Sequence, residues 1–295
     1  MSLLLSEFTN GLVLTSYYAL VACGLVLIFG VVGIVNFAHG DFVMLGGYLF
    51  YEFYIVLGEP YLAALVLATL AEGALALLMY VLVVRRLVSR EWYAPLIGTL
   101  ALSVLLESVA QAIWSAAPRS VATPAVFHVI RLGTAGTVNE QEIYVFVGTA
   151  LCLLTLWAVL GRSKWGKAMR AVAQNREACA VNGINVSAVA LGAFVAAAAL
   201  CALAAALVLP LQLISPTAGD AITTQAFVVV ILGGMGSIRG AVVASFIVGM
   251  VTALSAAYMS SAYTDAFGYG VMILMLLFRP VGLFGDASLR GWTGL

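Results

Sequence analysis

Long apolar stretches separated by short polar breaks make up almost the whole chain. An apolar run of about 20 residues is long enough to cross a bilayer as a helix. The runs are continuous and do not alternate with a period of two residues, so they predict helices and not the strands of a membrane barrel. Nine such stretches are present, at residues 9–33, 41–58, 61–84, 95–116, 143–160, 188–213, 222–236, 240–258 and 263–278.

The stretch at 222–236 is short and ends in glycines. Such a run is compatible either with a full crossing or with a half-helix that re-enters the membrane. We therefore predict an all-α polytopic membrane protein with about eight transmembrane helices, within a range of about seven to nine, in which glycine-rich segments break some helices. The whole chain, residues 1–295, is expected to form a single transmembrane domain.

Composition supports this prediction and excludes other classes of protein. Hydrophobic residues make up 64% of the 295 residues and charged residues only 9%, and the mean hydropathy is +1.12. A soluble domain carries about 25% charged residues. The 13 basic and 13 acidic side chains balance. The chain therefore lacks the excess of basic residues that would indicate a nucleic-acid partner. Metal binding and a disulfide framework are not expected, because no C-x-x-C spacing or neighbouring histidine accompanies Cys23, Cys152, Cys179 or Cys201.

Basic residues predict which loops face the cytoplasm, because Lys and Arg in short loops stay on that side of the membrane. Three arginines lie at 85–90, and the loop at 161–187 holds five basic residues. The loop at 117–142 contains only Arg119 and Arg131. We therefore expect 161–187 to be a cytoplasmic loop and 117–142 to be an extracytoplasmic loop.

The densest polar cluster inside the apolar regions lies between the first two stretches. Asn36, His39 and Asp41 occur there, with glycines on both sides. Polar groups at membrane depth are costly and usually mark function, so these side chains are candidates for lining a solute pathway at a broken helix. The N–H groups of a helix N-terminus would suit an anionic group there. The alternative is a tight turn at the membrane surface, in which Asp41 caps the following helix.

A second break, at residues 232–240, is rich in glycine and serine. Glycine permits positive φ angles, and the spacing of Gly236 and Gly240 allows two helices to approach closely. A gating hinge and an ordinary turn between helices are both consistent with this pattern. The candidates for flanking the solute pathway at this break are Gly233, Gly234, Gly236 and Ser237.

Two carboxylates lie near the middle of apolar stretches, Glu72 in 61–84 and Glu107 in 95–116. No Lys or Arg lies at a comparable depth, so we expect at least one of the two to be protonated or hydrogen-bonded. They either hold helices together through polar contacts or belong to a pathway that handles solute or protons. Around Glu107 a polar residue recurs every fourth position, which predicts one helix face directed at protein or water, formed by Thr99, Ser103, Glu107, Gln111 and Ser115.

The loop at 161–187 combines basic residues, alanines and a late glycine, Gly183. This pattern predicts a short amphipathic helix that ends near Gly183 and Asn185 and that either lies on the membrane or docks into another protein. Residues 161–168 are similar to a phosphate-binding P-loop. However, Ala168 stands where that motif needs Ser or Thr to hold Mg²⁺, and no strand is predicted before it. We do not expect this chain to bind ATP.

Three segments resemble a known family. Residues 24–48, GLVLIFGVVGIVNFAHGDFVMLGGY, resemble the signature of the H-type membrane permease of branched-chain amino-acid ABC importers. Residues 228–241, VVVILGGMGSIRGA, are similar to the second hallmark of that family. Glu177, Ala178 and Gly183 fall where its cytoplasmic coupling helix carries the pattern E-A-A-x-x-x-G, and Cys179 replaces the second alanine by another small residue. The resemblance covers essentially the whole chain.

The resemblance implies a multi-pass permease of the bacterial inner membrane that contacts lipid, a homologous second permease, two cytoplasmic ABC ATPases and an extracytoplasmic solute-binding protein. ATP and Mg²⁺ would be bound by the ATPases, and no cofactor is expected in this chain. The helix that seats in an ATPase groove would contain Arg170, Glu177, Ala178 and Gly183. From the polarity of these segments, and not from the resemblance, we assign to the flanks of the translocation path Asn36, His39, Asp41, Glu107, Gly233, Gly234, Gly236 and Ser237.

The function implied is translocation of leucine, isoleucine or valine by alternating access. Relatives that carry urea, short amides or other amino acids make these solutes alternatives. A proton-coupled secondary transporter that uses Glu72 and Glu107 is a further alternative. An enzyme is not expected, because His39 and His128 are the only histidines and neither is part of a nucleophile–base arrangement.

Overall fold

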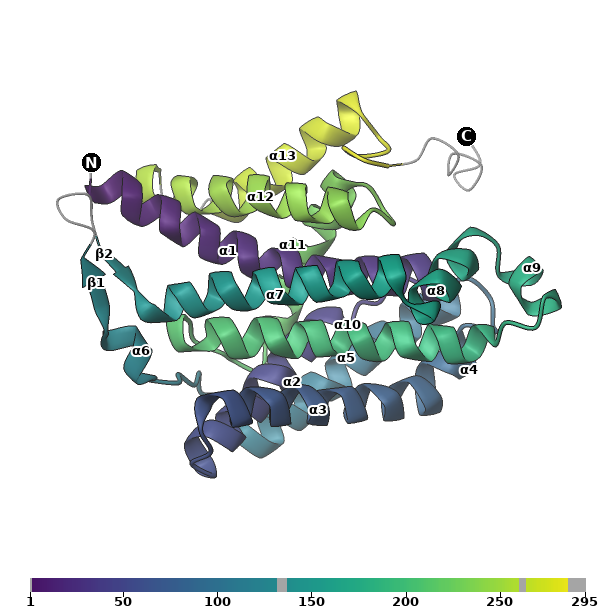
Figure 1. Cartoon of the computed structure of the whole chain (residues 1–295), viewed down its shortest axis with the longest axis horizontal. Coiled ribbons are helices and arrows are strands. Elements are labelled where there is room, and N and C mark those ends of the chain that lie inside the picture. Colours follow the sequence, from purple (N-terminus) through teal and green to yellow (C-terminus); the bar gives the residue numbers. More distant parts are fainter. Residues whose placement is uncertain (1, 132–136, 260–263, 286–295) are drawn as a thin grey trace.

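The computed structural model describes residues 2–131, 137–259 and 264–285, and most of these residues are helical. The long helices run roughly side by side along the longest axis of the molecule (Figure 1). The prediction of an all-α polytopic membrane protein is confirmed. Within the described residues, six helices are long and apolar enough to cross a membrane: Ser6–Val32, Tyr61–Leu87, Tyr93–Trp114, Glu140–Arg162, Val186–Leu211 and Ile238–Tyr258.

The helices follow one another along the chain with short connections, and several end in a π-helical or 3₁₀ turn. The first part contains α1 (Ser2–Leu27) with η1 (Ile28–Val32), α2 (His39–Tyr51) with η2 (Glu52–Val56), α3 (Tyr61–Met79) with η3 (Tyr80–Val84), α4 (Arg85–Leu87), α5 (Tyr93–Trp114) and α6 (Pro124–Phe127). The second part contains α7 (Glu140–Arg162), α8 (Lys164–Gln174), α9 (Arg176–Val181), α10 (Val186–Val208) with η4 (Leu209–Leu211), α11 (Ala218–Gly233), α12 (Ile238–Tyr258) and α13 (Thr264–Phe278).

The two ends of the molecule differ in structure. At one end, α6 precedes a two-stranded antiparallel hairpin of β1 (Val129–Arg131) and β2 (Thr137–Asn139), in which Ile130 pairs with Val138. We call this the hairpin end. At the opposite end lie α8 and α9, and we call this the α8–α9 end (Figure 1).

The core of the molecule is built around α1 and α10. Small residues on α10 allow its neighbours to approach closely, as where Gly46 of α2 packs directly against Ala202. In contrast, α7 directs large apolar side chains such as Leu151, Leu154 and Trp157 outward. Exposed apolar side chains along a whole helix suit contact with lipid and not with water.

The remaining apolar stretches contain shorter helices: α2 has 13 residues, α11 has 16 and α13 has 15. Both α2 and α11 begin inside the molecule, after extended segments. The segment before α11 leaves the hairpin end, where Ile214 and Arg119 exchange backbone hydrogen bonds of 2.8 and 2.9 Å. At the start of α11, Gly219 lies beside Asp41, and Asp41 lies beside Ser103, which is midway along α5. The two short helices therefore begin near the middle of the membrane-spanning layer.

The glycine-rich segment at 232–240 forms the connection between α11 and α12 at the α8–α9 end. The close helix approach there involves Gly233 and Gly240, because a methyl group on either would overlap the backbone of the other. The sequence predicted this approach at Gly236 and Gly240; Gly240 does take part, but nothing lies within 4 Å of a Cβ at Gly236. The helix pair is fixed further by the C-terminal segment, in which the Leu283 and Phe284 amides donate to the Leu232 and Gly233 carbonyls.

We predict that Gly240→Ala destabilises the protein by about 1–3 kcal/mol, because the new methyl group forces α11 and α12 apart. The measurement is the thermal midpoint of the purified protein in detergent, followed by size-exclusion chromatography after heating. Gly30→Ala is the matched control, since nothing lies within 4 Å of a Cβ there. Equal midpoints for the two variants would contradict the proposed packing.

Candidate functional site

The N-termini of α2 and α11 meet inside the molecule, and we call this meeting point the mid-depth junction. A methyl group on Gly40 would overlap the Gly219 carbonyl, and one on Gly219 would overlap the Asp41 carboxylate. The Gly40 amide donates to the Thr223 hydroxyl at 2.8 Å, and that hydroxyl donates to the Phe37 carbonyl at 3.2 Å. Thr223 thus connects α11 both to the extended segment before α2 and to the first turn of α2.

Asn36, His39 and Asp41 are all buried at or beside this junction, with at most 1% of each residue exposed. The alternative of a turn at the membrane surface does not hold. Asp41 is also not a helix cap, because the N-cap residue of α2 is Ala38 and no side chain caps it. The expectation of a broken helix at these residues agrees with the structure.

Each of the three side chains keeps one polar atom without a partner among the described residues: Asn36 Nδ2, His39 Nδ1 and Asp41 Oδ2. The other polar atoms of Asn36 and His39 fix their orientation. Asn36 Oδ1 accepts from the Ala38 amide at 3.2 Å, and His39 Nε2 donates to the Val21 carbonyl at 2.9 Å. Buried polar atoms without partners are rare in proteins and call for an explanation.

One face of α5 completes the surroundings of the junction. The Thr99 hydroxyl accepts from the Phe37 amide at 3.2 Å, and the Ser103 hydroxyl lies beside the Asp41 carboxylate. The next turn brings Glu107, which is half-buried and close enough to Asp41 to act on it electrostatically. The predicted polar face of α5 is therefore directed at α2 over this length.

Three carboxylates share this region, since Asp220 in the first turn of α11 also acts electrostatically on Asp41. Asp41 is buried, Glu107 half-buried and Asp220 exposed. In the part of the chain that the structure describes, the only contact of 4.0 Å or less between a basic and an acidic side chain is His128–Glu140 at the hairpin end, so no basic side chain pairs with these carboxylates. The partial positive charge at the two helix N-termini favours Asp41 and Asp220 in their first turns.

Glu72 of α3 is not among the groups that act electrostatically on Asp41, and it lies close enough to Cys201 of α10 to act on that residue. It is fully buried, and neither carboxyl oxygen has a hydrogen-bond partner among the described residues. The hydrogen-bonded alternative expected from the sequence therefore does not hold for this residue.

The structure does not bring the second glycine-rich break to the mid-depth junction. Gly233 is the last residue of α11, and Gly234, Gly236 and Ser237 lie in the turn that leads to α12 at the α8–α9 end. Gly234 and Gly236 have φ angles of 102° and 91°, and the Ser237 hydroxyl caps α12 by accepting from the Gly240 amide at 3.1 Å. This geometry is that of a capped turn between helices.

The loop at 161–187 contains two short helices and not the single helix predicted. Asn175 interrupts the helix and caps α9, accepting from the Ala178 amide at 2.9 Å, because its side chain competes for backbone hydrogen bonds. Glu177 and Ala178 are exposed on α9, and Gly183, with a φ angle of 80°, follows its end. Asn185, expected near the helix end, instead caps α10.

Some side chains of this loop hold α8 and α9 against the rest of the molecule and are not part of the exposed face. Cys179 is buried in a small apolar cluster with Val31, Val172 and Val189. Its replacement of alanine therefore concerns packing against α1 and α10 and leaves the exposed face of α9 unchanged. Arg170 donates to the Leu160 carbonyl at 2.7 Å and fixes α8 against the end of α7.

Arg176, the first residue of α9, is a functional candidate that the sequence reasoning did not single out. Its guanidinium donates to the Val32 carbonyl at 2.5 Å, at the end of η1. The next residue, Gly33, has a φ angle of 76° and begins the extended segment that leads to Asn36 and His39. Arg176 thus connects α9 to the start of the extended segment before α2. The two residues in this contact are 144 positions apart, so no local sequence pattern predicts it.

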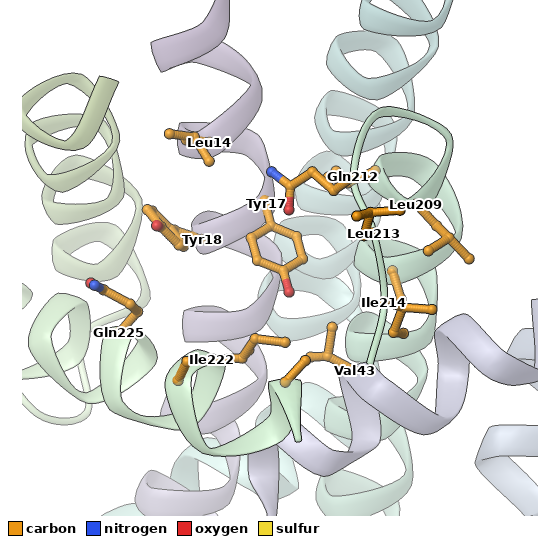
Figure 2. Close-up of a pocket in the computed structure, with 14 residues that line it drawn as sticks. Leu14, Tyr17, Tyr18, Val43, Leu209, Gln212, Leu213, Ile214, Ile222 and Gln225 are labelled. Carbon is orange, nitrogen blue, oxygen red and sulfur yellow. The ribbon is translucent and has the colours of Figure 1, made fainter. Parts of the chain in front are cut away.

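A cavity of about 270 Å³ lies between α1, the end of α10 and the start of α11 (Figure 2). Its walls are mostly aliphatic, and its polar groups come from Tyr17, Tyr18, Gln212 and Gln225. Figure 2 shows Tyr17 at its centre, between Gln212 and Val43. The chain before α11 is extended, and α11 itself begins only at mid-depth. No helix therefore fills this space, which lies in the half of the molecule nearer the hairpin end. The sequence did not predict the cavity, since Tyr17 and Tyr18 are about 200 residues away along the chain from Gln212 and Gln225.

Comparison with known proteins shows similarity along nearly the whole chain. Residues 8–276 match the family described as "Branched-chain amino acid transport system / permease component". The chain is 30% identical to the high-affinity branched-chain amino acid transport system permease protein BraD of Pseudomonas aeruginosa, over 95% of each chain. It is 29% identical to the corresponding protein LivH of Salmonella typhimurium, over 95% of each chain. It is 30% identical to a probable LivH of Methanocaldococcus jannaschii, over 94% of this chain and 91% of the other.

We predict that Thr223→Val destabilises the protein by about 1–3 kcal/mol, because the isosteric side chain leaves the Gly40 amide and the Phe37 carbonyl unpaired inside the molecule. The measurement is the thermal midpoint in detergent. Thr224→Val is the matched control, because that hydroxyl is exposed and bonds only to Asp220 within its own helix. A midpoint for Thr223→Val equal to that of the control would show that Thr223 does not hold the junction together.

Proposed function

The chain belongs to the family of permease components of branched-chain amino acid transport systems, and from this membership we propose that it is the membrane-spanning subunit of an ABC importer that carries leucine, isoleucine and valine. The observation that supports this most directly is the family match over residues 8–276. The names of the relatives favour branched-chain amino acids over urea or short amides. The subunit provides the route, and ATP is bound and hydrolysed with Mg²⁺ by partner subunits.

The orientation that we propose places the α8–α9 end in the cytoplasm. Ten of the 13 basic residues lie at that end: three at 85–90, five at 162–176, and Arg239 and Arg279. Two, Arg119 and Arg131, lie at the hairpin end, and Arg290 lies outside the described residues. Basic residues in short loops are retained on the cytoplasmic side of the inner membrane. The hairpin end then faces outward, toward an extracytoplasmic solute-binding protein.

We assign the translocation path to the face formed by α2, α5 and α11. This face presents Glu107, Ser108 and Gln111 of α5 together with Asp220 and Thr224 of α11, all at least partly exposed at membrane depth. Polar side chains at that depth face protein or a water-filled cavity and not lipid. A homologous second permease facing this surface would complete the path.

The mid-depth junction supplies the groups that a zwitterionic amino acid needs in the path. The N-terminus of α11 offers partial positive charge to a carboxylate, and Asp41, Glu107 and Asp220 offer negative charge to an ammonium group. The unpartnered polar atoms of Asn36, His39 and Asp41 are available for hydrogen bonds when the junction opens. Weak contacts that are distributed over several groups suit a transporter, because a tightly bound solute would not be released.

The exposed face of α9 is the site that we propose for docking of an ATPase. The face carries Glu177 and Ala178, and Arg176 on the same helix holds the Val32 carbonyl. Movement of a docked ATPase would therefore reach Gly33 and the extended segment before α2. Alternating access follows when this displacement opens the mid-depth junction to one side and then to the other.

The test of the proposed function is uptake of labelled leucine, isoleucine and valine by a strain that lacks this chain. Uptake should be lost in that strain and restored by the chain together with its partner subunits. It should fall when ATP is depleted and persist when a protonophore removes the proton gradient. Uptake that follows the proton gradient and ignores ATP would instead support a secondary transporter.

We predict that Glu177→Lys reduces co-purification of the ATPase and lowers uptake at least tenfold, because the substitution reverses a charge on the docking face. The measurements are the ATPase content of the purified complex and the initial rate of leucine uptake. Lys167→Glu is the control, because it reverses an exposed charge at the same end of the molecule outside α9. Normal ATPase content and uptake in Glu177→Lys would remove α9 as the docking site.

A further inference from the structure

A second cavity, of about 280 Å³, lies at the α8–α9 end, next to the extended segment that precedes α2. It is a half-open cavity bounded by η1, by the extended segment that starts at Gly33, by the start of α5 and by Arg176. The loop before α5 contributes Val88, Arg90 and Trp92. We call this cavity the inner pocket. None of the residues named above as candidates for the translocation path lines it.

The charged residues that line the inner pocket are all basic. Arg90 and Arg176 both line it, and no carboxylate is among its described lining residues. Arg176 uses one of its N–H groups on the Val32 carbonyl, which leaves further donors on the same guanidinium. In the part of the chain that the structure describes, the Arg90 side chain has no hydrogen bond or ion pair, although it lies at the pocket. Guanidinium groups bind carboxylates and phosphates through charge-assisted and frequently bidentate hydrogen bonds.

The rest of the pocket wall is apolar. Phe29, Val32, Ile34, Val35 and Leu96 contribute aromatic and aliphatic surface next to the two arginines. A ligand that satisfies both parts has a small anionic group attached to a branched or linear hydrocarbon. An aliphatic amino acid has this form.

The inner pocket is also in line with the path face of α5. Leu96 lines the pocket, Thr99 binds the Phe37 amide, Ser103 lies beside Asp41, and Glu107 follows, so that each step along this face of α5 is about one helical turn. Thr99 lies on α5 between the residue that contacts the pocket, Leu96, and the residue beside Asp41, Ser103. The carboxylates thus lie at mid-depth, and the two arginines line a pocket at the α8–α9 end of the same face of α5.

We infer that the inner pocket is a release-side binding site for an aliphatic amino acid, in which Arg90 and Arg176 bind the carboxylate and the apolar wall receives the side chain. The inference rests on the proposed function, because it takes the solute from it. Arg176 is also the first residue of α9, so a ligand in this pocket contacts the helix to which we assign ATPase docking.

The test uses the purified complex of this chain with its partner subunits in nanodiscs of phosphatidylcholine, without ATP and without the solute-binding protein. Equilibrium binding of tritiated leucine is measured for the wild type, Arg90→Gln and Arg176→Gln. Each arginine variant should bind leucine roughly tenfold more weakly, since it loses charge-assisted hydrogen bonds to the carboxylate. Arg86→Gln, an exposed arginine at the same end that does not line the pocket, should bind as the wild type does.

Two competitors separate the pocket from the mid-depth carboxylates. 4-Methylpentanoate, which has the carboxylate and the branched chain but no ammonium group, should displace leucine. 3-Methylbutylamine, which has no carboxylate, should not. Displacement by the amine alone would overturn the inference, because it would locate binding at the carboxylates. Arg176→Gln removes a bond to the Val32 carbonyl and could therefore disturb folding. Arg90→Gln tests the pocket without this complication, since the Arg90 side chain is exposed and holds no other residue in place.

ATP-driven leucine uptake, measured on the same complex with the solute-binding protein added, separates this inference from the proposed function. An absence of wild-type uptake would refute the proposed function. Normal uptake with leucine binding unchanged in both arginine variants would overturn only the inner pocket. If those variants instead lose co-purified phosphatidylglycerol and keep leucine binding, the pocket holds an anionic lipid, and the inference is also overturned.

Discussion

The whole arrangement depends on satisfying backbone groups where two helices begin in the middle of a membrane protein. A helix N-terminus leaves N–H groups without partners, and hydrocarbon offers none. Here the two helix starts face each other, and Thr223 links them by accepting from Gly40 and donating to Phe37. Glycine at 40 and 219 lets the backbones come close enough for this to work. The core helices α1 and α10, the polar face of α5 and the extended segments are all arranged around this contact.

Much of the fold could be predicted from the sequence because the membrane imposes simple rules. Continuous apolar runs predicted helices, and the polar cluster at Asn36, His39 and Asp41 predicted a broken one, since polar residues inside such runs need a special environment. The partner of that break could not be predicted. Nothing in the local pattern of 212–223 indicates that Gly219 and Thr223 meet Gly40, because the contact joins residues 183 positions apart.

The errors at the α8–α9 end have similar causes. Residues 164–181 have helical composition throughout, and the interruption at Asn175 depends on one side chain capping α9 instead of continuing α8. Gly236 and Gly240 have the spacing of a packing motif, yet Gly240 packs against Gly233, because the chain turns between the two helices. Arg176 and the inner pocket escaped notice because they are defined by tertiary contacts. Spacing rules describe one continuous helix, and each of these features lies where a helix stops.

The close fit of Gly40 against Gly219 has a mechanical consequence. From this contact, α2 runs toward the hairpin end and α11 runs toward the α8–α9 end, where Leu283 and Phe284 hold its far terminus. Neither helix has room to slide past the other. Since the two N-termini are in contact at mid-depth, a tilt of α11 at the α8–α9 end would have to be accompanied by a movement of α2, which extends to the hairpin end.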